Sequence, residues 1–408
     1  MRRNLLLLSS AFLLGLLVLE LGVRVVEPEK ADVTRFLMPD PVLHHRFIPG
    51  TRGRQRSSEF DVTYAINALG LRERPLAPGK PDGARRILML GDSFTEGLGV
   101  ESEQTFCALL QARLDREEPG ARWQVINAGV RSYSPLLEYI YLRTGGLDLQ
   151  PDVVVLNFDL SDVHDDIRYS SLAVAGEGGD PVAVPAPPAS YAESTRWQDE
   201  ASGPSGAHAS PPLGLLFGLK SLVKEHLHLY GFVRRRVEAR VAALQKPDAS
   251  GDIQKDRFAL LRDSYRPADE DWSPTFRHVT LIRDLLAARG VELWVTVYPY
   301  GLQVGPDEWG TGRRVWGFER GRVYSTAPQE HMEQFCRRHG IPVVNLCPAF
   351  RDAARTVHPL YADFDGHWRP AGHALVAKAL YESLAPRLRA LQAPATPPRP
   401  CARGPRTP

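Results

Sequence analysis

Cysteine is scarce in this chain, which has four in 408 residues. No two of them form a C-x-x-C pair, so a zinc ribbon is not expected, and four is too few for a fold built on disulfides. We therefore expect the cysteines to be buried, apolar thiols. A disulfide between Cys336 and Cys347 is the alternative if the compartment is oxidising.

An excess of charge of one sign is also missing. The chain has 50 Lys and Arg and 48 Asp and Glu, for a net charge of +2. The sequence has no dense basic stripe interleaved with aromatic residues, and neither a GxGxxG nor a GxxxxGK[ST] motif. We expect no nucleic-acid partner and no cofactor.

Long hydrophobic runs are missing except at the N-terminus. Two arginines at positions 2 and 3 precede an uncharged run over residues 5–19, and apolar residues continue past Glu20 and Arg24. The segment approaches the ~20 residues that cross a bilayer, and the charges near its far end can reach the interface. No clear A-x-A cleavage signature follows. We predict an uncleaved signal-anchor over residues 1–26, with the rest of the chain on the extracytoplasmic, periplasmic side. A cleaved signal peptide is the alternative.

Short apolar runs alternate with amphipathic helical patterns from residue 84 to residue 391. Completely apolar strands of this length are typical of a parallel sheet that helices cover on both faces. We therefore predict an α/β domain over this range. Its expected strands lie at residues 87–90, 123–126, 153–156, 293–297 and 342–346, and its expected helices at 105–117, from 135, 276–289 and 329–339, with a last helix after residue 373.

Other segments break this pattern. Residues 27–83 are predicted to be an N-terminal extension that packs on the main domain, with a strand near residues 60–66. An insertion over residues 171–257 begins with a stretch rich in Pro, Ala, Gly and Ser, then has a helical pattern over 213–244. We expect a cap over the edge of the active site, with a membrane-surface helix as the alternative. The proline-rich tail, 392–408, is expected to be disordered.

A serine follows the first strand of the predicted sheet, in the motif Gly91-Asp92-Ser93. The carboxyl ends of parallel strands form the ligand-binding edge of open α/β folds. A helix beginning there directs backbone N–H groups at an anion. On its own the motif also fits a serine or aspartate that only caps a helix.

A candidate base for this serine lies near the other end of the chain. Asp365-Gly366-His367 precedes the last amphipathic helix. A serine hydroxyl is a poor nucleophile until a base takes its proton, and a carboxylate commonly fixes the tautomer of that base. We predict Ser93, His367 and Asp365 as nucleophile, base and acid. His373, in contrast, is expected to pack or to cap the final helix.

These motifs resemble the conserved blocks of the SGNH/GDSL hydrolase superfamily. Gly91-Asp92-Ser93 is similar to the first block, the glycine of Asn127-Ala128-Gly129-Val130 to that of the second, and Asp365-Gly366-His367 to the fifth. The resemblance covers roughly residues 60–390. It implies a flavodoxin-like, three-layer α/β/α fold and an oxyanion hole that includes the N–H groups of Ser93 and Gly129.

The third block differs from the family pattern. That block usually reads Gly-x-Asn-Asp, and its asparagine donates to the oxyanion. This chain has Asp159-Leu160-Ser161-Asp162 instead. Either Ser161 takes the place of the asparagine or Asn157 reaches across. Losing one such donor costs on the order of 10²–10³ in rate.

The fifth block differs as well, because Asp-x-His-Trp stands where many hydrolases have Asp-x-x-His. This shorter form resembles exported polysaccharide O-acetyltransferases of the same superfamily. The expected function is hydrolysis of a carboxylic ester. The alternatives are O-acyl transfer to or from a cell-envelope polysaccharide, or a catalytically silent binding protein. The acidic run over residues 161–166 is a weaker candidate for a metal site.

Overall fold

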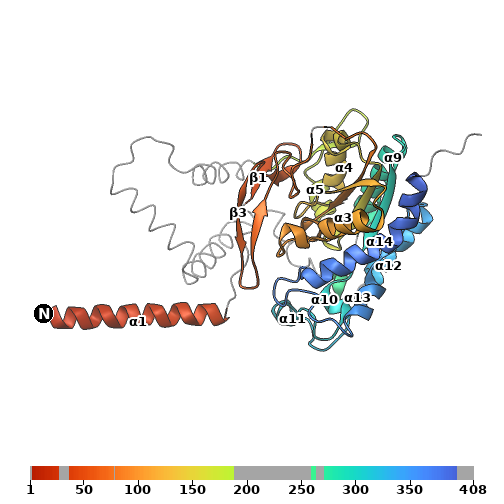
Figure 1. Ribbon diagram of the computed structural model, residues 1–408. Coiled ribbons are helices and arrows are strands. Elements are labelled where there is room, and N and C mark those ends of the chain that lie inside the picture. The colour runs from red at the N-terminus through yellow and green to blue at the C-terminus, as the bar shows by residue number, and fades with distance from the viewer. Residues whose placement is uncertain (1, 27–35, 78, 188–258, 263–270, 393–408) are drawn as a thin grey trace, which may run out of the picture.

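The core of the protein is one parallel sheet, in a computed structural model that describes residues 2–26, 36–77, 79–187, 259–262 and 271–392 (Figure 1). Its five strands lie in the order β11-β10-β7-β5-β6, and every neighbouring pair is parallel. Numbered along the chain this is 2-1-3-4-5, the flavodoxin-like order. The predicted α/β fold with a central parallel sheet is confirmed. The strands are β5 (Ala84–Gly91), β6 (Arg122–Asn127), β7 (Val153–Phe158), β10 (Glu292–Val297) and β11 (Val343–Asn345).

The two faces of the sheet bury separate hydrophobic clusters, because successive side chains of a strand point to opposite faces. In β5, Leu88 and Leu90 join one cluster, while Ile87 and Met89 join the other. The first cluster includes side chains of α4 (Pro135–Thr144), α5 (Ser161–Ser170), α9 (Ser273–Ala287) and α12 (Ala327–Arg338). The second includes side chains of α3 (Phe106–Glu117), α13 (Cys347–Ala353) and α14 (Pro370–Gln392).

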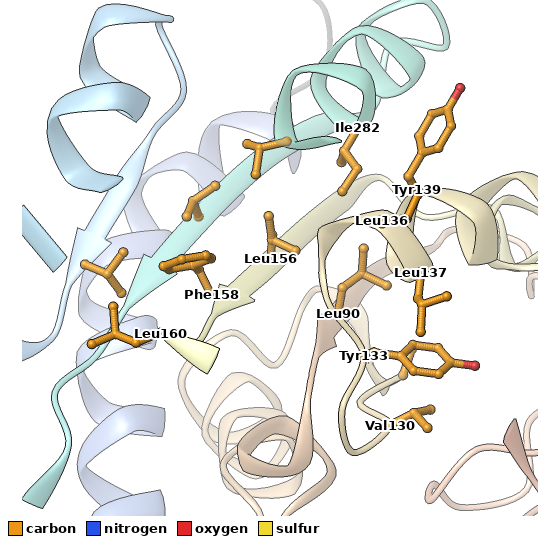
Figure 2. Close-up of a cluster of buried hydrophobic side chains, with 14 of the residues drawn as sticks. Leu90, Val130, Tyr133, Leu136, Leu137, Tyr139, Leu156, Phe158, Leu160 and Ile282 are labelled. Atoms are coloured by element: carbon orange, nitrogen blue, oxygen red, sulfur yellow. The ribbon is translucent and has the colours of Figure 1, made fainter. Parts of the chain in front are cut away.

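Helices pack closely on both faces of this sheet. Figure 2 shows Leu90 and Leu156 of the strands below Leu136 of α4 and Ile282 of α9, all in the first cluster. On the other face, α3 and α14 lie side by side (Figure 1). Completely burying a leucine or isoleucine contributes about 1.5–3 kcal/mol. The layers therefore hold the strand ends, from which the candidate site is built, in fixed positions.

The described part of the N-terminal extension forms two hairpins. β1 (Leu37–Asp40) pairs with β2 (His44–Phe47), and β3 (Arg52–Arg56) pairs with β4 (Asp61–Ala65). β4 confirms the strand predicted near residues 60–66. Phe47 and Tyr64 are completely buried in the same cluster as Leu90. The hairpins therefore share the hydrophobic core of the sheet.

The insertion is described only in part. Its first residues form the small hairpin of β8 (Val174–Ala175) and β9 (Pro181–Ala183). The predicted cap helix over 213–244 and nearly all of the proline-rich tail lie outside the described residues. The remaining short helices are α2 (Ser93–Glu96), η1 (Ser102–Gln104), η2 (Gly146–Leu149), η4 (Ala259–Leu261), α10 (Gly301–Val304) and α11 (Gly310–Val315).

The N-terminal segment forms helix α1, Arg2–Val26. Within the described residues, none of the helices combines the length and apolar character needed to cross a membrane. The structure therefore does not support the membrane span predicted over residues 1–26.

The cysteines agree with the first of the two expectations. Cys107, Cys336 and Cys347 are buried free thiols. The alternative disulfide between Cys336 and Cys347 is therefore wrong. The fourth cysteine, Cys401, lies outside the described residues.

Candidate functional site

Ser93 lies where β5 ends and α2 begins. This is the switch point of the sheet, because β6 and β7 lie on opposite sides of β5. Gly91, at φ +150°, allows the turn: a Cβ there would be 2.1 Å from Thr95 Oγ1. The Asp92 carboxylate caps α2 by accepting the Phe94 N–H at 2.9 Å. The motif thus caps a helix and also presents a half-buried serine at the edge of the sheet.

The structure places Ser93, His367 and Asp365 in one chain of hydrogen bonds. Ser93 Oγ is 2.7 Å from His367 Nε2. The other ring nitrogen, Nδ1, contacts Asp365 Oδ1, which also accepts the His367 N–H at 3.3 Å. When Nδ1 carries the proton and donates it to Asp365, Nε2 is free to accept from Ser93. The arrangement can therefore move a proton from the serine to the imidazole.

The electrostatics of this pair favour an ion pair. Burial by itself lowers the pKa of His367, but the charge of Asp365 and the hydrogen bond to it outweigh burial and raise this pKa above its ordinary value. Burial raises the pKa of Asp365, yet the charge and hydrogen bonds of His367 leave that pKa below its ordinary value. Both side chains are 20% exposed. The site therefore stabilises an imidazolium at His367, the species formed when Ser93 gives up its proton.

The loop that carries Asp365 and His367 is irregular, but hydrogen bonds hold it in place. An isolated bridge pairs Tyr361 with Trp368, and the Ala362 N–H donates to the His367 carbonyl at 2.8 Å. Trp309 donates from Nε1 to the Phe364 carbonyl at 3.0 Å. A Cβ at Gly366, which has φ +89°, would be 2.8 Å from that same Nε1. The glycine between Asp365 and His367 thus permits both the backbone turn and the close approach of Trp309.

The His367 ring borders a cluster of aromatic side chains. The ring of Phe94, the residue after Ser93, lies 4.7 Å from the His367 ring and 4.8 Å from that of Trp368. Trp368 is 2% exposed, and its ring also packs against that of Tyr298 at 4.7 Å. The contact with Phe94 limits the rotation of the imidazole.

Gly129 lies where the resemblance implies an oxyanion donor, just after β6. A Cβ there would be 2.3 Å from the Glu96 backbone nitrogen, so only glycine lets this turn approach α2. Its N–H donates to Asn127 Oδ1 at 2.9 Å. Ser93, in contrast, is the first residue of α2, and its N–H has no hydrogen-bond partner within the described residues. The Ser93 N–H is therefore free for an oxyanion, while the Gly129 N–H must share or change its acceptor.

Ser161 begins α5, and its hydroxyl is engaged elsewhere. Ser161 Oγ donates to Asp159 Oδ2 at 2.5 Å, and Tyr300 donates from its hydroxyl to the same oxygen at 2.8 Å. The side chain therefore points its hydrogen at a carboxylate, and donation to an oxyanion requires rotation of the hydroxyl.

The alternative donor, Asn157, has hydrogen-bond partners inside the sheet. Its Nδ2 donates to the Leu90 carbonyl at 2.8 Å, and its Oδ1 accepts from Thr296 Oγ1 at 2.8 Å. The side chain is 2% exposed and joins neighbouring strands of the sheet. Both ends of the amide therefore have partners inside the sheet, and Asn157 would have to give up the bond to Leu90 or donate its second amide hydrogen to take part in an oxyanion hole.

Two buried carboxylates near Ser93, Asp92 and Asp159, were not predicted as part of the site. Asp92 Oδ2 lies 3.4 Å from Ser93 Oγ, and Asp92 Oδ1 accepts from the Tyr298 hydroxyl at 3.3 Å. Burial, with the charge of Asp159 second, raises the pKa of Asp92 to about 8. Their positions at the ends of strands were visible in the sequence, but the effect of Asp159 on Asp92 required the three-dimensional structure.

The weaker candidates have other partners. Asp166 Oδ1 accepts from Ser134 Oγ at 2.7 Å and from the Leu136 N–H at 2.9 Å, so Asp166 caps the start of α4. Within the described ranges, no group of three or more His, Cys, Asp or Glu side chains could hold a metal ion. His373 is buried, and its Nδ1 accepts the Phe106 N–H at the start of α3. Burial lowers its pKa to about 3, which agrees with a packing role.

Comparisons with known proteins give a match in the C-terminal third. The sequence profile of one family, described as "SGNH hydrolase-like domain, acetyltransferase AlgX", matches residues 260–400. This range includes Asp365 and His367 but begins well after Ser93, which it does not cover. No curated protein sequence matches the chain.

Several solved structures resemble the chain at low identity. A two-domain esterase active on acetylated mannans is 13% identical, with a TM-score of 0.37; the match covers 77% of this chain and 52% of the esterase, so it spans about half of that protein. The acetyl xylan esterase AlAXEase is 12% identical, with a TM-score of 0.37 and coverage of 73% and 99%. A catalytic mutant of Axe2, an acetylxylan esterase from Geobacillus stearothermophilus, is 13% identical, with a TM-score of 0.36 and coverage of 75% and 95%. These scores are too low to transfer chemistry.

Proposed function

We propose that this chain is a serine esterase that hydrolyses a carboxylic ester through a covalent acyl-enzyme on Ser93. The observation that carries the proposal is the 2.7 Å contact between Ser93 Oγ and His367 Nε2, with Asp365 on the other ring nitrogen. A nucleophile, a base within hydrogen-bond reach and a group that orients the base are the three parts that such catalysis needs.

Acylation begins when Ser93 Oγ attacks the carbonyl carbon of the ester. His367 Nε2 takes the hydroxyl proton, and Asp365 stabilises the resulting imidazolium. The carbonyl oxygen becomes an oxyanion, to which the free Ser93 N–H can donate, with the Gly129 N–H as second donor. When the bond to the leaving alkoxide breaks, His367 returns the proton to it, and an alcohol departs.

Deacylation repeats these steps with water. His367 takes a proton from water as its oxygen attacks the acyl carbon. The bond to Ser93 Oγ then breaks, and His367 returns the proton to the serine. The carboxylic acid leaves, and neither step needs a cofactor.

The test uses the purified chain and short acyl esters of p-nitrophenol. We expect wild-type turnover and a loss of at least ~10³-fold for Ser93→Ala, since removing the nucleophile abolishes the covalent route. Ser383→Ala is a matched control, because that hydroxyl bonds to the Ala379 carbonyl within α14. Equal activity of the wild type and Ser93→Ala would reject the proposal.

Acyl transfer is the second candidate, favoured by the match of residues 260–400 to a family described as an acetyltransferase. In this reaction a sugar hydroxyl of an envelope polysaccharide replaces water in the second step, and His367 takes its proton. Adding envelope glycans to the esterase assay separates the two. An acylated glycan detected by mass spectrometry would favour transfer, and free carboxylic acid alone would favour hydrolysis.

A silent binding protein of the same fold is a third possibility, raised by the serine at position 161. A fluorophosphonate probe that labels Ser93 would exclude it.

Extracytoplasmic location is a separate proposal that rests on the apolar N-terminal run. Finding the intact protein in the cytoplasmic fraction of its native cell would reject that proposal.

A further inference from the structure

The loop that carries Asp365 has two backbone N–H groups that neither a helix nor a strand satisfies. The Phe364 N–H donates to Glu59 Oε1 at 3.0 Å, and the Asp365 N–H donates to Glu59 Oε2 at 2.7 Å. One carboxylate thus holds two consecutive peptide groups, the second of which belongs to the acid itself. Glu59 is more than 300 residues away in sequence, and its side chain is only 12% exposed.

Glu59 is itself fixed in a tight turn. It lies at the tip of the β3–β4 hairpin, where Ser57 Oγ accepts the N–H groups of Glu59 at 3.1 Å and Phe60 at 3.3 Å. The Ser57 N–H donates to the Phe60 carbonyl at 2.9 Å and closes the turn. Arg369, at 4.0 Å, adds a positive charge beside the Glu59 carboxylate. The turn and the charge of Arg369 therefore both fix the position of the Glu59 carboxylate.

The same hairpin also contacts the segment that follows Ser93. The Thr63 N–H donates to both carboxylate oxygens of Glu101, at 3.1 and 3.0 Å. The Phe60 ring covers Gly99, where a Cβ would be 3.1 Å from Phe60 Cδ1. Tyr64 donates from its hydroxyl to Glu96 Oε1 at 2.6 Å, at the end of α2. One hairpin thus joins the nucleophile segment to the acid–base loop.

We propose that Glu59 is a positioning residue for the acid–base loop, so that the N-terminal hairpin is a working part of the catalytic unit. The inference rests on the proposed esterase function. Two N–H bonds to one carboxylate fix the direction of the peptide that carries Asp365, and charge-assisted bonds of this kind are roughly twice as strong as neutral ones. A shift of ~1 Å in a positioning element can cost on the order of 10² in rate. Glu59 therefore acts on the chemistry through Asp365, without touching substrate.

The test compares Glu59→Ala and Glu59→Gln with Asp61→Asn in the full chain. Asp61 lies on the same hairpin and pairs with Arg54 and Arg56, away from the acid–base loop, so it controls for lost charge and hairpin stability. We expect kcat to fall about 10- to 100-fold in Glu59→Ala, with KM nearly unchanged. Glu59→Gln keeps one acceptor oxygen and should fall less. Asp61→Asn should match the wild type.

Two further readouts separate positioning from stability. In the Glu59 variants the acid limb of the pH profile of kcat/KM should move to lower pH, because a displaced Asp365 no longer raises the pKa of His367 as strongly. Amide hydrogen exchange should accelerate in a peptide that contains Phe364 and Asp365, and should not do so in Asp61→Asn. Unchanged kcat, pH profile and exchange in both Glu59 variants would overturn the inference. Because exchange needs no catalysis, it tests the hold of Glu59 even if Ser93→Ala shows that the proposed function is wrong.

Discussion

The two sides of the candidate site differ in how complete they are. On the proton-transfer side, Ser93, His367 and Asp365 already contact one another as the proposed chemistry requires. On the oxyanion side, the Gly129 N–H donates to Asn127, and the Ser161 hydroxyl donates to Asp159. Only the Ser93 N–H has no partner within the described residues. The site is therefore preorganised for proton transfer, while its stabilisation of negative charge depends on fewer donors, and substitutions on the two sides should have unequal effects.

The largest effect is expected on the proton-transfer side. His367→Ala removes the base, and Asp365→Asn removes the charge that fixes its tautomer. We expect kcat/KM for a short acyl ester to fall on the order of 10⁴-fold in each. Because the two residues act as a unit, the double variant should be little worse than either single one. Independent, multiplying losses would show that the pair does not work as one relay.

Gly129→Ala should have the next largest effect, because its Cβ would be 2.3 Å from the Glu96 backbone nitrogen. The turn must then move away from α2, at a cost of about 1–3 kcal/mol in stability. We expect kcat to fall on the order of 10²–10³, and thermal melting to give the change in stability. Gly120→Ala is the control, since Gly120 is exposed and a Cβ there meets nothing within 4 Å. Equal kcat in the two variants would remove Gly129 from the oxyanion side.

Asp92→Asn should act mainly at alkaline pH. In the wild type, activity should rise as His367 loses its proton and fall again as Asp92, whose pKa is raised to about 8, becomes charged beside Ser93. The variant should lose the alkaline limb.

The raised pKa of Asp92 also means that folding favours the protonated carboxyl. This stabilisation is present below the unfolded-state pKa and is lost as pH rises through about 8. Asp92→Asn should therefore raise the melting temperature relative to wild type at pH 9 and have little effect near pH 4. An alkaline limb that persists in the variant would contradict this assignment.

The smallest effect is expected for Ser161→Ala, because the hydroxyl of Ser161 points at Asp159. We expect kcat to change less than tenfold, well below the 10²–10³ typical of a lost oxyanion donor. Steady-state kinetics on a short acyl ester give the answer. A loss of 10² or more would mean that the hydroxyl rotates toward the oxyanion, and the two sides of the site would then be more alike than the structure shows.

Much of the fold could be predicted because short apolar runs and amphipathic patterns in the sequence indicate its strands and helices. The apolar run at residues 87–90 lies inside β5, and the run at 153–156 forms the first four residues of β7. The residue types at the ends of these strands also identified Ser93 as a candidate. His367 and Asp365 followed from chemistry and family resemblance, since no local pattern places them near Ser93.

The parts that could not be predicted depend on contacts between distant residues. Glu59 and Trp309 hold the acid–base loop by hydrogen bonds to its backbone groups. Every residue of the loop has such groups, so its sequence does not show which of them are bound. Only the register of the sheet shows that the Asn157 amide lies between Leu90 and Thr296. The membrane span predicted over residues 1–26 rested on a hydrophobic run with its flanking charges, and the described helices do not support it.

The most direct test of the account is the mass of the protein during a single turnover of an activated acetyl ester. We predict a transient increase equal to one acetyl group, located on the peptide that contains Ser93, and absent from His367→Ala on the same timescale. Turnover with no acetyl on Ser93, or the same adduct formed equally fast without His367, would contradict the central claim that these two residues form a nucleophile and its base.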